Sequence, residues 1–401
     1  MGLNSEGENW YVTESSISLY DGVGKLSSSP NQSFATDLQV VAPLGSRQVL
    51  TVGGSFKHDQ SHSKDRTLPN WTNRKAKGAV TYTADGQDVL YGLFVQDEIA
   101  ITDKLTAYAG LRADWWKVYD GEVNQAGSSD YPKIYASRRD SAYSPKLALV
   151  YQPLEQTTCK LSAGKAFRAP SIYDLYRTWS SVSGSKTTIY NANPMLKPET
   201  VNAWDMSVKQ GLWQGADVEI SYFENYLNDL IYRVTVSNTA TLNDQIWTNA
   251  GKAETKGFTV SANQQVQDWL RLYGNTTVLT SSKVVHNWAG VKNGQNTHGK
   301  HLQQLPMRMI NLGVEGQYKG LTASLNGRYV SRRFSTDNNS DYADDCYGVY
   351  EAYSVADAKL SYTWRENATI AVAIDNLFDR DYWDSYKAPG RTSYVEVGFK
   401  F

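Results

Sequence analysis

The chain has 401 residues, and its 40 Lys and Arg against 41 Asp and Glu give a formal net charge of −1 at pH 7. This balance excludes a nucleic-acid partner held by bulk electrostatics. No apolar run approaches the length of about 18 residues that a membrane helix needs, so a bilayer could be crossed only by strands closed into a barrel.

The composition is polar on average but rich in aromatic residues. Mean hydropathy is −0.50, which a barrel tolerates because one face of each strand meets water. The chain holds 27 Tyr and 12 Trp, and these residues favour the interface between membrane and water. A Tyr-rich soluble β-protein, such as a carbohydrate binder, remains an alternative.

The N-terminal residues 1–8 lack the basic start and apolar core of a secretion signal. We therefore expect no signal peptide in this sequence. Either the signal has been removed with other upstream sequence, or the chain begins artificially.

Stretches that alternate between apolar and polar residues recur in chain order, at 50–57, 89–96, 105–115, 204–209, 218–223, 321–329, 356–364 and 370–374. Each predicts a strand with two different faces. Several polar partners are charged, which suits a water-filled lumen. We expect four cations to point into it: Arg112, Arg271, Arg328 and Lys359. They could steer an anionic chelate or pair with lumenal acids.

The predicted connections fall into two classes. Tight turns are expected at 102–104, 214–216, 318–320 and 365–367, and long polar loops at 60–87, 120–139, 176–198, 283–300 and 334–348. Short turns on one side and long loops on the other are typical of an outer-membrane barrel. One strand with its connection takes about 22 residues, which predicts about 18 strands, give or take two, in a single domain over residues 1–401.

The last residues form the clearest single strand. One face carries Val395, Val397, Phe399 and Phe401, and the other carries Tyr394, Glu396 and Lys400. This pattern predicts a C-terminal strand with lipid on one side and a wet lumen on the other, suited to closing the barrel against the first strand. An edge strand of a soluble β-sandwich would alternate in the same way.

Other candidate sites are weaker. His286, His298 and His301 lie at irregular spacing, and the loop with Asp337, Asp341, Asp344 and Asp345 lacks the order of an EF-hand, so we predict no metal site. Cys159 and Cys346 show no metal or redox spacing and are expected to be unpaired. No catalytic or nucleotide-binding motif occurs, so we do not expect an enzyme.

An ordered series of motifs resembles the C-terminal barrel of TonB-dependent outer-membrane receptors. It covers most of 50–401 and includes 143–151, 161–176, 193–199, 220–231, 248–257, 375–382 and 389–391. Two of its motifs flank a loop and are expected to be mainly structural: Phe167, Arg168, Ala169 and Pro170, then Asn193, Pro194 and Leu196. Haem-importing relatives carry a histidine between these motifs, and none stands there here, so we predict no haem and no other cofactor.

The resemblance implies a barrel of about 22 strands, plugged by an N-terminal domain and coupled to TonB. This sequence shows nothing like the plug, and we expect no counterpart to roughly the first four strands of the family barrel. TonB is therefore a partner only if a plug lies upstream. The leading hypothesis is a barrel in the outer membrane of a Gram-negative bacterium, taking up an iron–siderophore chelate or a cobalamin. The alternative is a plugless passive pore or a truncated barrel that transports nothing.

Overall fold

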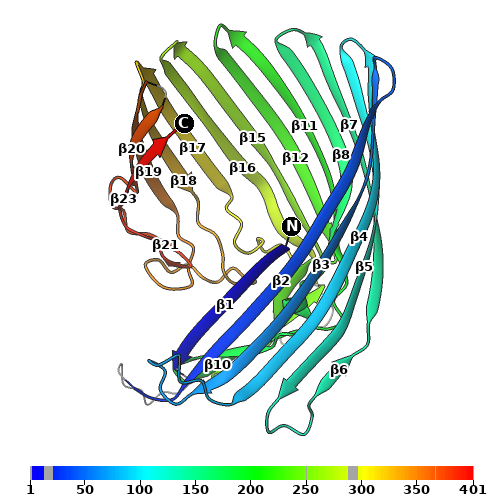
Figure 1. Cartoon of the computed structure of the whole chain (residues 1–401), viewed down its shortest axis with the longest axis vertical. Coiled ribbons are helices and arrows are strands. Elements are labelled where there is room, and N and C mark those ends of the chain that lie inside the picture. The colour runs from blue at the N-terminus through cyan, green and yellow to red at the C-terminus, as the bar shows by residue number, and fades with distance from the viewer. Residues whose placement is uncertain (1, 13–20, 250, 288–296, 366, 401) are drawn as a thin grey trace.

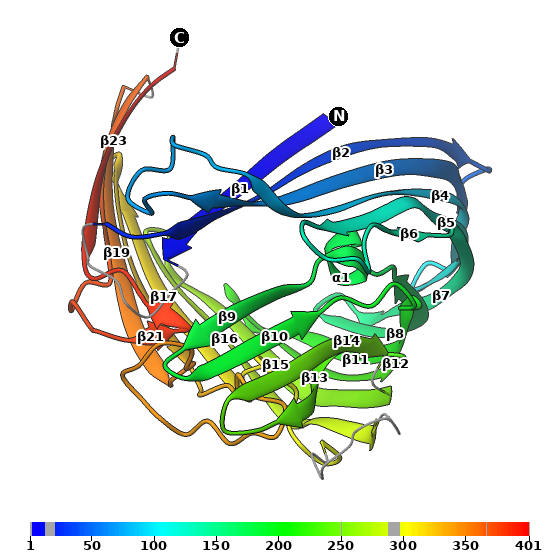
Figure 2. The same ribbon diagram turned by 90° about the horizontal axis from the view of Figure 1, so that it is seen from below.

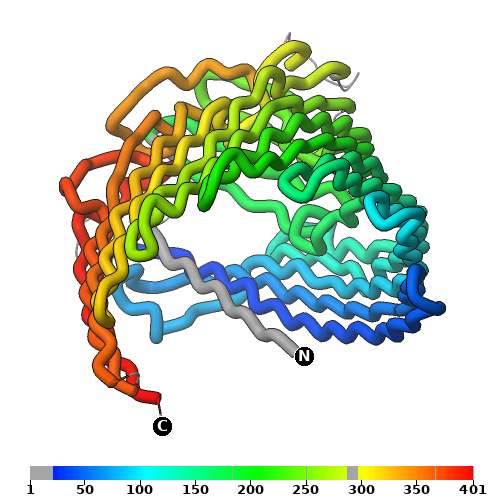
Figure 3. Tube along the Cα trace, turned by 90° about the horizontal axis from the view of Figure 1, so that it is seen from above, coloured from blue at the N-terminus to red at the C-terminus, as the bar shows by residue number. Residues whose placement is uncertain are grey.

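The computed structural model describes residues 2–12, 21–249, 251–287, 297–365 and 367–400. It is dominated by one 17-stranded sheet. One of these strands, β6 (Lys133–Tyr135), has only three residues. The other sixteen pair in chain order, each antiparallel to the next. The sheet curves around a hollow lumen (Figure 1, Figure 3). The predicted antiparallel barrel architecture is confirmed, and sixteen strands lie within the predicted range.

The sixteen strands have these bounds: β1 (Gly2–Val12), β2 (Gly24–Pro43), β3 (Gln48–Leu68), β4 (Val80–Thr102), β5 (Leu105–Gln125), β7 (Arg138–Leu154), β8 (Thr157–Arg168), β11 (Glu199–Trp213), β12 (Ala216–Asn228), β15 (Gly251–Gln267), β16 (Leu270–Asn287), β17 (Arg308–Tyr318), β18 (Leu321–Val330), β19 (Tyr353–Trp364), β20 (Ala368–Asp375) and β23 (Thr392–Phe399). A short pair, β21 (Trp383–Asp384) and β22 (Tyr386–Lys387), stands apart.

The two edges of the sheet are β1 and β23. β23 pairs with β20 along its whole length, and no pairing between β1 and β23 is found in the described part of the chain. Val395, Val397 and Phe399 are strongly exposed on the outer face of β23, whereas Glu396 meets Lys359 on the other face. Closure of the barrel by this strand stays a prediction, and Phe401 lies outside the described residues.

The predicted tight turns at 102–104, 214–216 and 318–320 are confirmed, and the one predicted at 365–367 includes residue 366, which lies outside the described residues. The hairpin turn between β17 and β18 shows why they are tight: Lys319 and Gly320 have φ of 49° and 82°, as a two-residue type I′ turn requires. The short turns gather at one end of the barrel, and the long connections gather at the other, lower end in Figure 1.

The predicted long loops were in part wrong. β3 and β4 leave only residues 69–79 between them, and β5 continues to Gln125. These strands extend past the membrane into water, where the outer face is no longer apolar, and in β3 both faces are polar from His58 to Thr67, so the alternation that reveals a strand is lost there. The predicted loop at 176–198 also contains two strands, β9 (Trp179–Ser183) and β10 (Lys186–Asn191). The one at 334–348 contains none among the described residues.

Aromatic side chains bound an apolar band on the outer face. Towards the long loops the row is Phe34, Phe56, Tyr91, Trp115 and Tyr143, in which the first three rings follow one another at 6.2 and 6.0 Å. Towards the short turns it is Tyr151, Trp213, Trp269, Tyr318 and Trp364, all exposed. Between the rows lie exposed aliphatic side chains such as Leu147, which is 63% accessible. Such paired girdles mark the two interfaces of a lipid bilayer.

The described residues include no helix with the length and apolar character needed to cross a membrane.

The most tightly packed part of the molecule lies inside the lumen, near the long loops. Residues 169–198, which we call the strap, leave β8, turn inward and form the short helix α1 (Ile172–Tyr176). Ile172, Leu175 and Tyr176 pack into a core with side chains from β4, β5 and β13 (Ile231–Asn238), namely Tyr82, Ala84, Trp116, Val118, Val123 and Ile231. The close approach needs small inward residues, because a Cβ on Gly121 would lie 2.4 Å from the Tyr176 ring.

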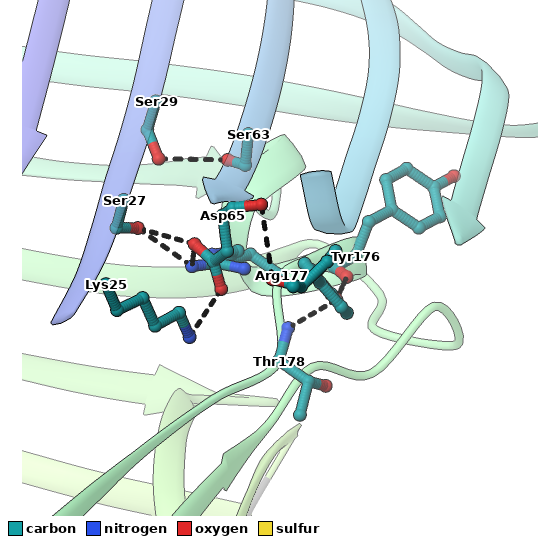
Figure 4. Close-up of polar contacts among 10 residues, drawn as sticks. Lys25, Ser27, Ser29, Ser63, Asp65, Tyr176, Arg177 and Thr178 are labelled. Carbon is teal, nitrogen blue, oxygen red and sulfur yellow. Dashed lines mark hydrogen bonds and ion pairs between the residues drawn. The ribbon is translucent and has the colours of Figure 1, made fainter. Parts of the chain in front are cut away.

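A buried ion pair fastens the strap to the barrel wall (Figure 4). Arg177 is only 3% accessible, and its Nη2 donates to Asp65 Oδ1 at 2.5 Å and to Ser27 Oγ at 3.0 Å. Lys25 Nζ reaches Asp65 Oδ2 at 2.6 Å. The neighbouring backbone is held by Tyr82, whose hydroxyl donates to the Tyr176 carbonyl and accepts from the Thr178 amide, both at 3.1 Å. We call this group the Arg177 latch.

Electrostatics keep the latch charged. Asp65 lies well past the girdle residue Phe56, outside the membrane band. Burial alone would disfavour its charge, but Arg177 and Lys25 outweigh burial and lower the pKa of Asp65. A carboxyl with a lowered pKa stabilises the fold above its unfolded pKa, and this contribution is lost as the pH falls through the folded value.

The apolar band predicts a side-dependent response to charge. Leu147→Arg places a cation midway between Tyr143 and Tyr151 on the lipid face, and we expect it to lower the free energy of unfolding in bilayers by about 2–4 kcal/mol. Ala148→Arg is the matched control, because residue 148 is the next position in the strand and faces the lumen, where it pairs in register with Tyr108. Urea titrations of both variants in lipid vesicles measure the difference, and equal losses would contradict a lipid-facing band.

The Arg177 latch predicts a non-additive pair of variants. Asp65→Asn leaves Arg177 buried without a carboxylate, which costs about 3–5 kcal/mol for a buried pair. The double variant Asp65→Asn with Arg177→Met removes the stranded charge, and we expect it to lose less. Hydrogen exchange of the Thr178 amide reports opening of the strap. Lys209→Met, which removes the exposed Lys209–Asp217 pair, serves as the control and should change little.

The pKa of Asp65 predicts how the latch responds to acid. After correction for intrinsic exchange, protection of the Thr178 amide should be the same at pH 7 and pH 5, and should fall only below the ordinary carboxyl value of about 4. Loss of protection already near pH 6 would show that Asp65 is not the group that holds the strap.

Candidate functional site

A second, smaller sheet lies across the mouth of the barrel (Figure 2). It has four strands in the order β13-β14-β10-β9, where β14 is Leu242–Asn249. β9 and β10 belong to the strap, whereas β13 and β14 come from the connection between β12 and β15. β10 and β14 pair in parallel, and the other two pairs are antiparallel. Two connections distant in sequence therefore build one platform, which we call the mouth sheet.

The second sequence motif joins the two halves of the mouth sheet. Asn193 Nδ2 donates to the Trp247 carbonyl at 2.9 Å, and its Oδ1 accepts from the Met195 amide at 2.9 Å. Arg138 of β7 donates to the carbonyls of Pro194 and Leu196. The Leu196 side chain is fully buried in the strap core. These contacts are those of a loop anchor, and a mainly structural role for the motif stays a prediction.

The first motif links the strap to β13 and lines the lumen. Arg168 Nε donates to Glu199 Oε1 at 2.6 Å, and Glu199 Oε2 accepts from the Ile231 amide at 2.7 Å. Phe167, Ala169 and Pro170 lie beside a lumenal cavity of about 710 Å³. The charged residues that line this cavity are of both signs: Lys57, Arg112, Arg168, Asp59, Asp88 and Asp114.

The four lumenal cations of the sequence analysis do not converge on one site. Arg112 is paired with the buried Asp114, Nη2 to Oδ1 at 2.6 Å, and lines the cavity. Lys359 lies 3.5 Å from Glu396. Arg271 Nε donates to Asn263 Oδ1 at 2.6 Å, and Arg328 stands 5.9 Å from the Tyr353 ring. Pairing within the barrel wall thus occupies two of them, and a role in steering ligands stays a prediction.

One face of the mouth sheet gathers aromatic rings around a cation. Trp179 and Tyr190 stack with ring centroids 3.9 Å apart and an interplanar angle of 16°. The Arg233 guanidinium lies 4.7 Å from the Tyr190 ring and 5.1 Å from the Trp247 ring. The strand register places Tyr190 opposite Trp179 and Arg233 opposite Trp247, so all four share one face. We call it the aromatic–arginine face.

A polar cavity of about 180 Å³ continues from this face. Arg233, Thr235, Asn243 and Gln245 supply one wall, and the opposite wall is Gln303, Gln304, Ser335, Thr336, Asp337, Asn338 and Ser340. Burial raises the pKa of Asp337, which favours its neutral form. Rings that stack on a guanidinium beside amide and hydroxyl groups suit a planar, anionic and strongly hydrogen-bonding ligand.

The histidine and aspartate candidates have structural partners. His301 Nδ1 lies 3.1 Å from the Ser282 carbonyl, and Asp341 accepts hydrogen bonds from Ser335 and Thr336. Within the described ranges no cluster of three or more His, Cys, Asp or Glu side chains is arranged to hold a metal ion. Cys159 and Cys346 are free.

The sequence analysis missed the aromatic–arginine face and the Arg177 latch. The strap was predicted as a polar loop, and its Trp179 and Tyr190 look like ordinary aromatic residues in a Tyr-rich chain. Arg177 lies 112 residues from its partner Asp65. The only available signal was the composition of the strap, which holds more aromatic residues than a solvated loop needs.

Comparison with known proteins gives a consistent family. The model for the TonB dependent receptor-like β-barrel matches residues 4–377. The iron-regulated outer membrane virulence protein of Vibrio cholerae is 25% identical over 371 residues, covering 90% of this chain and 49% of that protein. The vitamin B12 transporter BtuB of the same species is 24% identical, covering 92% of this chain and 55% of that protein. The chain thus spans about half the length of these relatives.

Solved structures show the same fold at low identity. The ferric citrate transporter FecA has a TM-score of 0.70 at 16% identity, covering 100% of this chain and 58% of that one. The ferric enterobactin receptor PfeA of Pseudomonas aeruginosa has a TM-score of 0.65 at 18% identity, covering 94% and 58%. With the strand order, the sorted loops and the girdles, the family match over most of the chain places this protein in the TonB-dependent receptor-like β-barrel family.

Proposed function

We propose that the chain is the membrane barrel of a receptor in the outer membrane of a Gram-negative bacterium. The receptor takes up a scarce, bulky nutrient by a TonB-dependent route. An iron–siderophore chelate is the ligand class that the site fits best, and a cobalamin is the second. The iron-regulated protein and the vitamin B12 transporter of Vibrio cholerae support both classes.

The observation that carries this proposal is the aromatic–arginine face of the mouth sheet. The mouth sheet that carries this face lies across the long-loop end of the barrel (Figure 2), where an incoming ligand would first meet protein. Arg233 between Tyr190 and Trp247 supplies a fixed positive charge and stacking surfaces. A ferric chelate with planar anionic donors uses both features, whereas a cobalamin would use mainly the stacking surfaces.

The strap gives the site its rigidity. The Arg177 latch and the core around α1 hold one half of the mouth sheet, and the contacts of Asn193 hold the other half against it. A rigid face loses little conformational freedom on binding, which raises affinity. Coupling to TonB would need a plug domain upstream of this chain.

Arg233→Gln tests the face in the whole receptor. We expect uptake of radioactive iron from anionic ferric chelates by iron-starved cells to require about tenfold more chelate for half-maximal rate, because a charged and stacked contact contributes about 1–2 kcal/mol. The matched control is Arg365→Gln. Arg365 also stacks on a ring, at 4.8 Å from Trp364, but at the short-turn end.

The alternative reading predicts different results. A passive pore would conduct ions across planar bilayers without any dependence on Arg233, and cells without the protein would take up iron and vitamin B12 normally. Normal uptake of both nutrients in such cells would overturn the proposal. Loss of vitamin B12 uptake alone would replace the chelate by a cobalamin.

A further inference from the structure

The polar cavity of the mouth sheet contains a hydrogen-bond acceptor that the protein leaves unpaired. Oδ1 of Asn243 is buried, and no donor reaches it within the described part of the chain. Asn243 lines the cavity of about 180 Å³ that continues from the aromatic–arginine face. A buried acceptor without a donor is destabilising, and folded proteins keep few of them. A ligand group that donates an O–H or N–H to this oxygen would remove the penalty.

The strand register places the unpaired acceptor and the aromatic rings on one continuous face. In β14 every second residue shares this face, namely Asn243, Gln245 and Trp247. Tyr190 of β10 pairs in register with Gln245, and it stacks on Trp179 of β9. Asn243 is about 13 Å from Trp247 along the strand. A ligand that contacts the rings therefore has its next neighbouring group beside Asn243.

Other walls of the cavity carry amides that the protein does not engage. Gln245 belongs to the sheet, whereas Gln303 and Gln304 come from the connection between β16 and β17. Among the described residues, none of these three side chains forms a hydrogen bond. A primary amide presents a donor and an acceptor side by side. Hydroxyl groups on adjacent ring atoms match that arrangement, because each hydroxyl both donates and accepts.

The charges around the cavity favour a neutral group inside it. Arg233 is the only cation among the described residues that line it, and the Tyr190 and Trp247 rings lie 4.7 and 5.1 Å from its guanidinium. Asp337 is the only carboxyl in the same lining, and burial raises its pKa. A carboxylate or catecholate oxygen only accepts hydrogen bonds, so it would leave Asn243 Oδ1 unpaired. The anionic part of a ligand thus fits beside Arg233, and a group with its own donors fits deeper in.

The size of the cavity limits what it can hold. Its 180 Å³ is about a quarter of the lumenal cavity of about 710 Å³. This space holds several water molecules, or one small ring with its substituents. A whole ferric chelate is too large for it. The polar cavity is therefore a subsite for one part of a larger ligand.

We propose that the polar cavity binds a sugar-type group, a ring with several hydroxyls, carried by the nutrient. One hydroxyl donates to Asn243 Oδ1, and neighbouring hydroxyls pair with the amides of Gln245 and Gln303. The anionic part of the ligand lies on the aromatic–arginine face beside Arg233. This inference rests on the proposed function and deepens it, because it assigns the part of the ligand that the rings and the guanidinium do not contact.

The test compares three ligands on the purified full receptor. They are a ferric tris-catecholate chelate, the same chelate with glucose attached to its catechol rings, and maltotriose. Isothermal titration calorimetry measures each Kd in an amine-oxide detergent, because glucoside and maltoside detergents would compete for the cavity. We expect the glucosylated chelate to bind at least about tenfold more tightly than the plain chelate, since a site built for hydroxyls discriminates against an analogue without them.

Variants of two different walls locate the preference. Asn243→Leu removes the acceptor at similar volume, and it should abolish the preference for the glucosylated chelate without changing the Kd of the plain chelate. Asn243→Asp keeps an oxygen at this place and should retain most of the preference. Gln303→Met changes the wall outside the sheet and should lose part of the preference, which keeps the proposal testable where Asn243→Leu disturbs the sheet. Gln214→Met, in the turn between β11 and β12, is the matched control and should change nothing.

The outcomes separate this proposal from the proposed function. Equal binding of the two chelates by the native receptor would overturn the sugar-type subsite, and so would a preference that survives both Asn243→Leu and Gln303→Met. Binding of maltotriose alone, abolished by Asn243→Leu, would uphold the subsite and would instead overturn the chelate as the nutrient. Binding of none of the three ligands would overturn both.

Discussion

The need to satisfy every backbone N–H and C=O group without water determines this structure. In lipid each unpaired group costs several kcal/mol, so strands that cross the membrane must pair on both sides. This explains why sixteen strands follow one another in chain order, with turns as short as residues 319–320 at one end. The edges β1 and β23 are the two places where the described residues leave that requirement open.

The requirement that every backbone group pair within the protein weakens above the aromatic girdle, and connections other than tight turns occur there. β3 and β4 continue past Phe56 and Tyr91 into water, where both faces can be polar. Because water or protein can satisfy the backbone, the strap is free to turn inward and fold against the wall. Its small core and the Arg177 latch then replace lipid as the source of order. The mouth of the barrel is thus ordered by packing and an ion pair in addition to strand pairing, whereas the membrane part is held by backbone hydrogen bonds between strands.

The membrane-spanning part of the fold was predicted well from the sequence, because lipid and water lie on opposite faces of its strands. Where lipid lies on one side and water on the other, as over residues 105–115, apolar and polar residues alternate along the strand and reveal its two faces. Above the girdle the contrast between lipid and water is gone, and most of the predicted loop at 60–87 belongs to β3 and β4. The mouth sheet could not be predicted at all, because the parallel pairing of β10 with β14 joins two connections and depends on tertiary packing. Sequence motifs located the strap but did not show that Arg233 lies between two of its neighbouring rings.

β3 shows how one strand can link the inside of the barrel to the membrane surface. Its inward residue Asp65 fastens the strap, and its outward neighbours Lys64 and Arg66 line a separate small pocket on the outer face. Adjacent residues in a strand point in opposite directions but share one backbone. Lys64 and Arg66 therefore share one short backbone segment with the residue that positions Arg177, and through it with the strap half of the aromatic–arginine face. The order of the mouth sheet thus depends on the pairing of β3 in the barrel wall as well as on contacts within the lumen.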